Sequence, residues 1–102
     1  MAAAGTKVQI GLRLKAARIA LGYDKKRGRT QAAFYRLFGI DRGRANNWER
    51  GRVYPNTDFL VMLNERFEVD PGWILAGKRG GLPDRIADKV VENFRKIAGD
   101  YR

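Results

Sequence analysis

The side chains best suited to chemistry in this chain lie together in the segment RGRANNWER, residues 42–50. Three arginines and two asparagines are carried there by what the pattern predicts to be one short helix. The major groove of DNA is wide enough for one α-helix, and its base edges offer donors and acceptors that arginine and asparagine side chains pair with. The chemistry that this segment favours is therefore non-covalent recognition of a duplex, with the helix lying in the groove.

Catalytic and metal chemistry have little support in the composition. The chain contains no histidine, cysteine or serine, which removes the commonest general base, the usual nucleophiles and most metal ligands. Neither paired carboxylates at acid/base spacing nor a glycine-rich phosphate loop stands out. We predict that the protein is not an enzyme and that it uses no cofactor and no metal.

The positive charge of the chain is concentrated in its first half. The formal net charge is +10, and residues 7–52 alone carry 13 Lys or Arg against 3 Asp or Glu, a balance of +10. The remainder is close to neutral. This distribution indicates a polyanionic partner; the alternative is a basic surface that is only solvated.

The length of the chain, together with the lack of a recognisable targeting signal, predicts a small cytoplasmic protein. The 102 residues suit one compact domain with an appendage. The start MAAAGTKVQIG lacks the apolar core of a signal peptide, and no stretch is long and apolar enough to span a membrane. The absence of cysteine is compatible with a reducing cytosol.

Apolar residues recur at helical spacing through most of the chain, and the sequence predicts an all-α fold. Caps are expected at Thr30, Asp41, Asn56 or Thr57, and Asp70. The expected helices are 8–21, 31–38, 42–50, 57–67, 72–75 and 84–98. The expected organisation is a flexible N-terminus at 1–7, a DNA-binding domain at 8–77 with an inserted basic loop at 24–29, a linker at 78–83, and a C-terminal helix and tail at 84–102.

The two short helices around Gly-Ile-Asp, residues 39–41, have the pattern of a helix-turn-helix. Together with IGLRLKAARIALG before them and PNTDFL and VDPGWILAG after them, they make residues 10–77 resemble the lambda-repressor-like (Cro/XRE-type) DNA-binding domain. The resemblance implies a five-helix domain, here with an additional C-terminal amphipathic helix, which binds double-stranded operator DNA as a homodimer and regulates transcription, most simply as a repressor.

The resemblance also implies roles for individual residues. Base-reading positions, with their flanking residues, are Arg42, Gly43, Arg44, Asn46 and Asn47. Phosphate-binding positions are Gln31, Arg50, Arg52, Tyr54 and Asn56, where Gln31 could instead steady a base-reading side chain. Arg18 and Glu49 match a partly buried, structural salt bridge of the family.

Several of these roles have plain alternatives. Arg42 either pairs with guanine or only holds a phosphate. Asn47 either pairs with adenine or is a solvated helix residue. Gly43 either lets the backbone approach a base pair or is merely tolerated near a helix start. Trp48 and Trp73 are predicted to be core residues, since both fall on apolar helix faces.

The chain departs from the family pattern at two places. Tyr35 stands where the family has a small residue, and Ala45 stands at the facing position where it has Ile or Val. We hypothesise that this exchange keeps the volume of the helix contact constant. The inserted loop adds Lys25, Lys26, Arg27 and Arg29, which either reach flanking phosphates or only aid solubility.

The last predicted helix leaves the choice of partner open. Ile86, Val90, Phe94 and Ile97 line its apolar face. This face either extends a dimer surface or folds back onto the core. A rival function is an antitoxin-like or other protein-interaction module, in which the C-terminal helix binds a partner protein.

Overall fold

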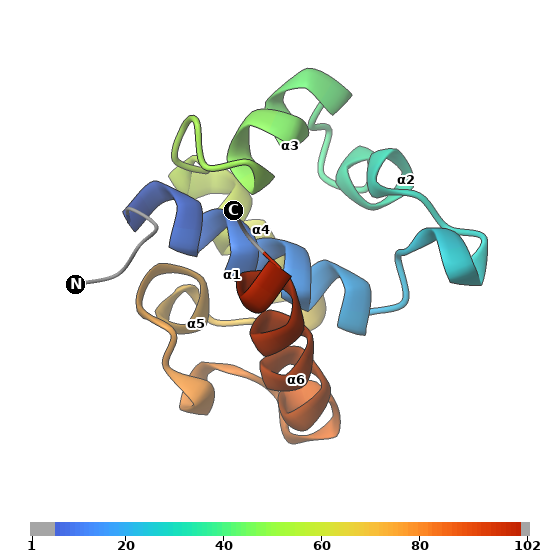
Figure 1. Cartoon of the computed structure of the whole chain (residues 1–102). Coiled ribbons are helices and arrows are strands. Elements are labelled where there is room, and N and C mark those ends of the chain that lie inside the picture. Colours follow the sequence, from blue (N-terminus) through green and yellow to red (C-terminus); the bar gives the residue numbers. More distant parts are fainter. Residues whose placement is uncertain (1–5, 101–102) are drawn as a thin grey trace.

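The computed structural model describes residues 6–100, and within this range the chain is all-α without strands, as the sequence predicted (Figure 1). The helices are α1 (Thr6–Ala20), α2 (Gln31–Arg36), α3 (Arg42–Glu49), α4 (Thr57–Phe67), α5 (Pro71–Ala76) and α6 (Asp84–Asp100). Two short 3-10 turns, η1 (Lys25–Arg27) and η2 (Arg79–Gly81), lie in the loops before α2 and α6. Most of the expected flexible N-terminus, residues 1–5, lies outside the described residues, and α1 begins two residues earlier than expected.

Local side-chain caps explain where four of the helices begin. The Thr30 hydroxyl accepts a hydrogen bond from the amide of Ala33, and the Asp41 carboxylate accepts one from the amide of Arg44. Asn56 and Asp70 cap α4 and α5 in the same way. A cap satisfies a backbone donor that the first helical turn leaves without a partner.

The end of α2 differs from the expected boundary. The sequence predicts a helix to Phe38, but the regular hydrogen bonding ends at Arg36. The amides of Leu37, Phe38 and Gly39 instead bond to carbonyls three residues back, which tightens the last turn. Gly39 then adopts a positive φ of 71°, a conformation that suits glycine because it has no Cβ.

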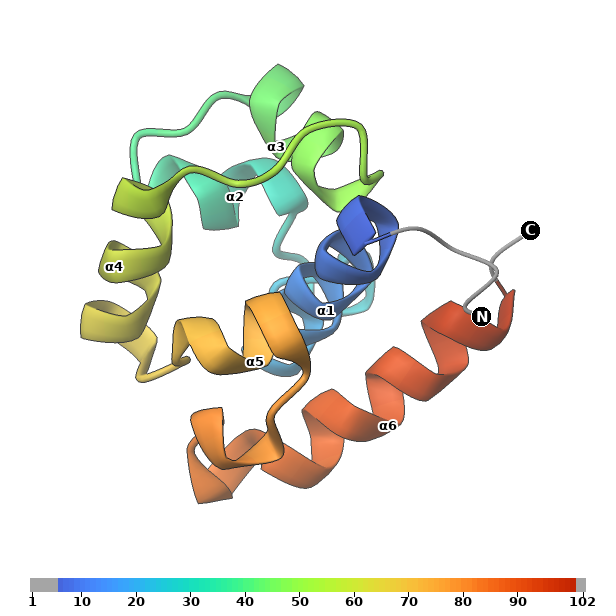
Figure 2. The ribbon, with the colours of Figure 1, turned by 90° about the vertical axis from the view of Figure 1, so that its left-hand side faces the viewer.

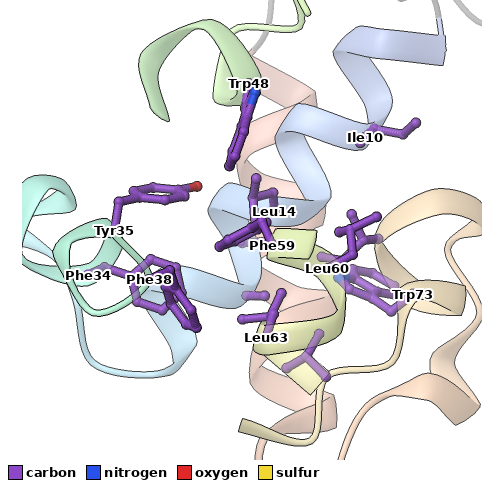
Figure 3. Packing of buried hydrophobic residues seen from close by; sticks show 14 of the residues in the cluster. Ile10, Leu14, Phe34, Tyr35, Phe38, Trp48, Phe59, Leu60, Leu63 and Trp73 are labelled. Atoms are coloured by element: carbon purple, nitrogen blue, oxygen red, sulfur yellow. The ribbon is translucent and has the colours of Figure 1, made fainter. Parts of the chain in front are cut away.

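The core has an aromatic cluster at its centre, between α1, α2, α3 and α4, and it continues through apolar residues of α5 and α6 (Figure 3). Phe34, Tyr35 and Phe59 are completely buried, and the Phe38 ring lies edge-on to Phe59 at 5.1 Å between centroids. Trp48 and Trp73 are 3% and 4% exposed. Both tryptophans are therefore core residues, and neither is available as a stacking platform for bases.

The C-terminal helix folds back onto the chain. Helix α6 packs against α1 in both ribbon views (Figures 1 and 2) and buries Ala87 and Val90. The Asn93 carboxamide donates to the carbonyl of Ala16 over 3.3 Å. The segment before α6 is also tied down, since Leu82 is 5% exposed and the Asp70 amide donates to the Gly81 carbonyl. Of the two arrangements that the sequence left open, the structure has the apolar face of α6 turned toward the monomer's own core.

Candidate nucleic-acid interface

Helix α3 has one side in the core and one side open to solvent. Its buried residues are Ala45, Trp48 and Glu49, at helical spacing. The other residues of α3 are the five candidate base-reading positions: Arg42, Gly43 and Arg44 are exposed, and Asn46 and Asn47 are partly exposed. A helix with this division offers its cationic and amide groups to a partner outside the chain.

A buried ion pair holds the C-terminal end of α3 against α1. Arg18 Nε lies 2.8 Å from Glu49 Oε2, and Arg18 Nη2 lies 2.9 Å from Glu49 Oε1. The two residues are 6% and 7% exposed. The third guanidinium nitrogen of Arg18 donates to the carbonyl of Tyr23 at 2.6 Å, so this side chain also fixes the chain where it leaves α1.

Two side chains of α2 complete the network around the same carboxylate. The Tyr35 hydroxyl donates to Glu49 Oε2 at 2.7 Å, and the Gln31 carboxamide donates to Glu49 Oε1 at 3.0 Å. One carboxylate therefore joins α1, α2 and α3. Because a fully hydrogen-bonded buried charge tolerates little displacement, the network sets the angle at which α3 is presented.

The network changes the ionisation of its members. Burial lowers the pKa of Arg18, but the hydrogen bonds and negative charge of Glu49 outweigh burial, and the net pKa is raised. Burial first, and then the charge of Glu49, raise the pKa of Tyr35 well above its ordinary value. Both changes keep protons on the donors, so the ion pair and the tyrosine hydrogen bond persist at neutral pH.

Close backbone contact also positions α3. A Cβ built on Gly11 of α1 would lie 2.5 Å from the carbonyl oxygens of Trp48 and Glu49. The two helices touch there, main chain to main chain, at a distance that only glycine permits. After α3, Gly51 has a φ of +74° and a Cβ there would lie 2.5 Å from Val8 Cα.

A polar cleft of about 560 Å³ opens beside α3, between α1, the inserted loop and the start of α2. Its basic lining residues are Lys15, Arg18, Lys25, Arg42 and Arg50. The two carboxylates that line it already have partners, since Glu49 accepts from the network and Asp24 accepts from the amide of Arg27. Glu49 neutralises Arg18, and the other four cations give the cleft an excess of positive charge.

The cleft contains several of the predicted site residues and one basic residue that was not predicted. It brings Gln31, Asn46 and the three cations Lys25, Arg42 and Arg50 to one place. Lys15 was not among the candidates, although it lies three residues before Arg18 and so shares its face of α1, a spacing that could have indicated it.

The remaining candidates lie around the cleft. Arg52 and Tyr54 are exposed beyond the end of α3, where the Lys7 ammonium lies 5.3 Å from the Tyr54 ring centroid. The side-chain oxygen of Asn56 caps α4, which leaves its carboxamide nitrogen as the remaining side-chain hydrogen-bonding group. Arg44 lies over the Trp48 ring at 5.6 Å, a contact that holds its guanidinium along α3.

The inserted loop is an ordered basic turn. Lys25, Lys26, Arg27 and Arg29 are all exposed. Asp24 caps the turn, and the Arg29 guanidinium lies 5.2 Å from the Tyr23 ring centroid. The four cations are therefore displayed by a defined backbone rather than by an unstructured segment.

Comparison with protein-family profiles matches residues 14–74 to the helix-turn-helix family of the Cro/C1 type. The match spans α2, α3 and α4, together with the last part of α1 and most of α5. The chain belongs to this family, and it is a DNA-binding regulator of the Cro/XRE kind. Comparisons with curated proteins and with solved structures returned no match.

Within the part of the chain that the structure describes, none of the helices combines the length and the apolar character needed to cross a bilayer.

Proposed function

We propose that this protein is a sequence-specific, repressor-like regulator that binds double-stranded DNA as a homodimer with α3 in the major groove. The observation that carries the proposal is the division of α3, whose apolar side is buried while Arg42, Arg44 and Asn47 face outward. The Glu49 network gives that surface a fixed orientation.

The proposed contacts divide into two kinds. Arg42 and Asn47 suit bidentate pairing with guanine and adenine, while Gly43, Arg44 and Asn46 border them. Phosphates are held on both sides of α3. On one side of α3 the phosphates bind in the cleft, to Lys15, Lys25 and Arg50. On the other side they bind to Arg52, Tyr54 and Asn56. Phosphate contacts set the register, and base contacts select the sequence.

Dimer formation is supported by exposed apolar side chains that follow α3. Among the described residues that follow α3, Val53, Val61 and Leu75 are aliphatic side chains that are 47–50% exposed. A twofold dimer through this part of the chain places two recognition helices about 34 Å apart, which is one turn of the duplex. The expected site is accordingly a palindrome.

Selection of bound duplexes from a random library tests the proposal. The expected result is an enriched palindrome, and Arg42→Ala and Asn47→Ala should each relax the preference at one position of each half-site, at a cost of about 1–3 kcal/mol. Arg36→Ala, at an exposed position on α2 outside the cleft, is the matched control. If both α3 variants weaken all sequences equally, the base-reading roles are wrong.

The inserted loop has its own test. Replacing Lys25, Lys26, Arg27 and Arg29 by glutamine should reduce the dependence of log K on log salt by roughly one unit for each phosphate that the loop no longer binds. An unchanged slope would assign the loop to solubility alone.

The antitoxin-like alternative placed its partner on the C-terminal helix. The apolar side of that helix is occupied by α1, with Val90 completely buried. The described contacts therefore favour the regulator alone.

A further inference from the structure

A second polar groove lies on the other side of the inserted loop from the α3 cleft. It has a volume of about 520 Å³ and separates the loop from α6. The loop lines it with Lys25, Lys26 and Arg27, and α6 lines it with Lys89 and Lys96. The match to the helix-turn-helix family ends at residue 74, before α6 begins.

The groove has an excess of positive charge. It is lined by five cations and two carboxylates, Asp24 and Glu92, a balance of 5 − 2 = +3. Asp24 accepts the amide hydrogen of Arg27, and Glu92 lies 4.0 Å from the Lys96 ammonium. The other four cations face a shared space from two separate elements, an arrangement that attracts a multiply charged anion.

The two sides of the groove are held in place. On the α6 side, Asn93 donates to the carbonyl of Ala16 in α1, which ties the helix to the central helix of the domain. On the loop side, the amide of Arg29 bonds to the carbonyl of Asp24 and closes the turn. The backbone on both sides of the groove is therefore already in place, and a ligand has to order only the exposed side chains.

The groove adjoins the α3 cleft. Ile19, Asp24 and Lys25 line both hollows, so the loop forms the wall between them. A DNA strand that passes the start of α2 and crosses this wall arrives at Lys89 and Lys96. We infer that the groove between the loop and α6 is a second phosphate-binding site, which extends the duplex-binding surface onto the C-terminal helix.

The identification of the ligand as flanking duplex DNA rests on the proposed function. The inference that the groove binds phosphate groups does not depend on it. A free polyphosphate or phosphorylated metabolite has the same chemistry. The experiment therefore uses two ligands: duplexes of two lengths and inorganic tripolyphosphate.

Two double variants are compared, a groove variant and a control variant, and each removes two positive charges from the protein. Lys89→Gln with Lys96→Gln removes two cations of the groove. Arg95→Gln with Lys78→Gln removes two exposed cations, one of them on the same helix, that do not line it. Circular dichroism melts should show that both variants fold, because all four side chains are exposed.

Affinities are measured for the selected site alone and for the same site extended by about one helical turn, roughly ten base pairs, at each end. The wild type should bind the longer duplex more tightly and with a steeper salt dependence. The groove variant should lose this gain, with the slope reduced by about one unit for each lysine. The control variant should retain it.

Tripolyphosphate is titrated in parallel against the wild type and the variants, with amide resonances of residues 25–27 and 89–97 as the readout. Saturable shifts that disappear in the groove variant support the site even if no duplex is bound, and would then assign it to a free phosphorylated ligand. A groove variant that equals the control in both measurements overturns the inference, whether or not the wild type binds DNA.

Discussion

Replacing Tyr35 by phenylalanine removes one hydroxyl from the Glu49 network and leaves the ring in place. The ring packs edge-on to Trp48 at 6.2 Å and tilted to Phe59 at 5.6 Å, and these contacts do not need the oxygen. The hydroxyl donates to a charged acceptor at 2.7 Å. We therefore expect Tyr35→Phe to lower the free energy of unfolding by about 1.5–3 kcal/mol near pH 7, the range for a hydrogen bond to a charged group.

The same substitution changes how stability depends on pH. Burial and the charge of Glu49 raise the pKa of Tyr35 well above 10 in the folded protein, whereas an unfolded chain ionises its tyrosines near pH 10. Above that pH the folded state holds one proton more than the unfolded state, so stability falls as pH rises. Between pH 9 and pH 11 this contribution removes at most about 1.4 kcal/mol from the wild type, the limit set by ionisation of the tyrosine in the unfolded chain, and nothing from the phenylalanine variant.

Urea unfolding at pH 7, 9, 10 and 11 and constant ionic strength provides the measurement. The stability difference between wild type and Tyr35→Phe should narrow from pH 9 to pH 11, by at most about 1.4 kcal/mol. Tyr54→Phe is the control at pH 7, where a side chain that is 49% exposed should change stability by less than about 0.5 kcal/mol. A difference that stays constant or widens with pH would refute the reasoning.

The remaining predictions concern the helices and their contacts, and each is checked by urea unfolding. Gly11→Ala should lower the free energy of unfolding by about 3 kcal/mol, because the added methyl group would meet main-chain oxygens of α3. Gly99→Ala is the control. A Cβ at Gly99 meets no atom within 4 Å, so this change should stabilise α6 by about 0.5–1 kcal/mol. Arg18→Met should cost about 3–5 kcal/mol by leaving its buried carboxylate partner without a counter-charge, and a change below about 1 kcal/mol would contradict this. Tyr35→Ala combined with Ala45→Ile should cost less than either single change; additive costs would rule out the volume exchange.

The helices and their starts could be predicted because they depend on neighbours along the chain. Thr30 and Asp41 each accept from the amide three residues on, so the residue type and its place before an apolar run were enough. The outward side of α3 followed from the same local reasoning, since Trp48 at helical spacing from Ala45 marks the buried side. The 3-10 turn within the loop was not predicted, because none of its residues is apolar or buried and no periodic pattern marks it.

The ion pair of Arg18 and Glu49 was suggested by family resemblance, but its further partners were not. Tyr35 appeared only as a residue too large for its position, while the structure gives its hydroxyl to Glu49. Within residues 6–100, the Glu49 carboxylate accepts four side-chain hydrogen bonds that join three helices. No local sequence pattern specifies how these helices are placed relative to one another.

By itself the sequence determined the helical content, the caps, the concentration of positive charge and the cationic, amide-bearing side of α3. These properties arise from contacts within a few residues or from composition. Only the tertiary structure decided that α6 covers α1, with Asn93 reaching Ala16 across 77 positions, and that Gly11 allows α1 to touch the end of α3. An amphipathic helix requires that its apolar side be covered but does not specify by what, and that choice depends on how all the helices pack together.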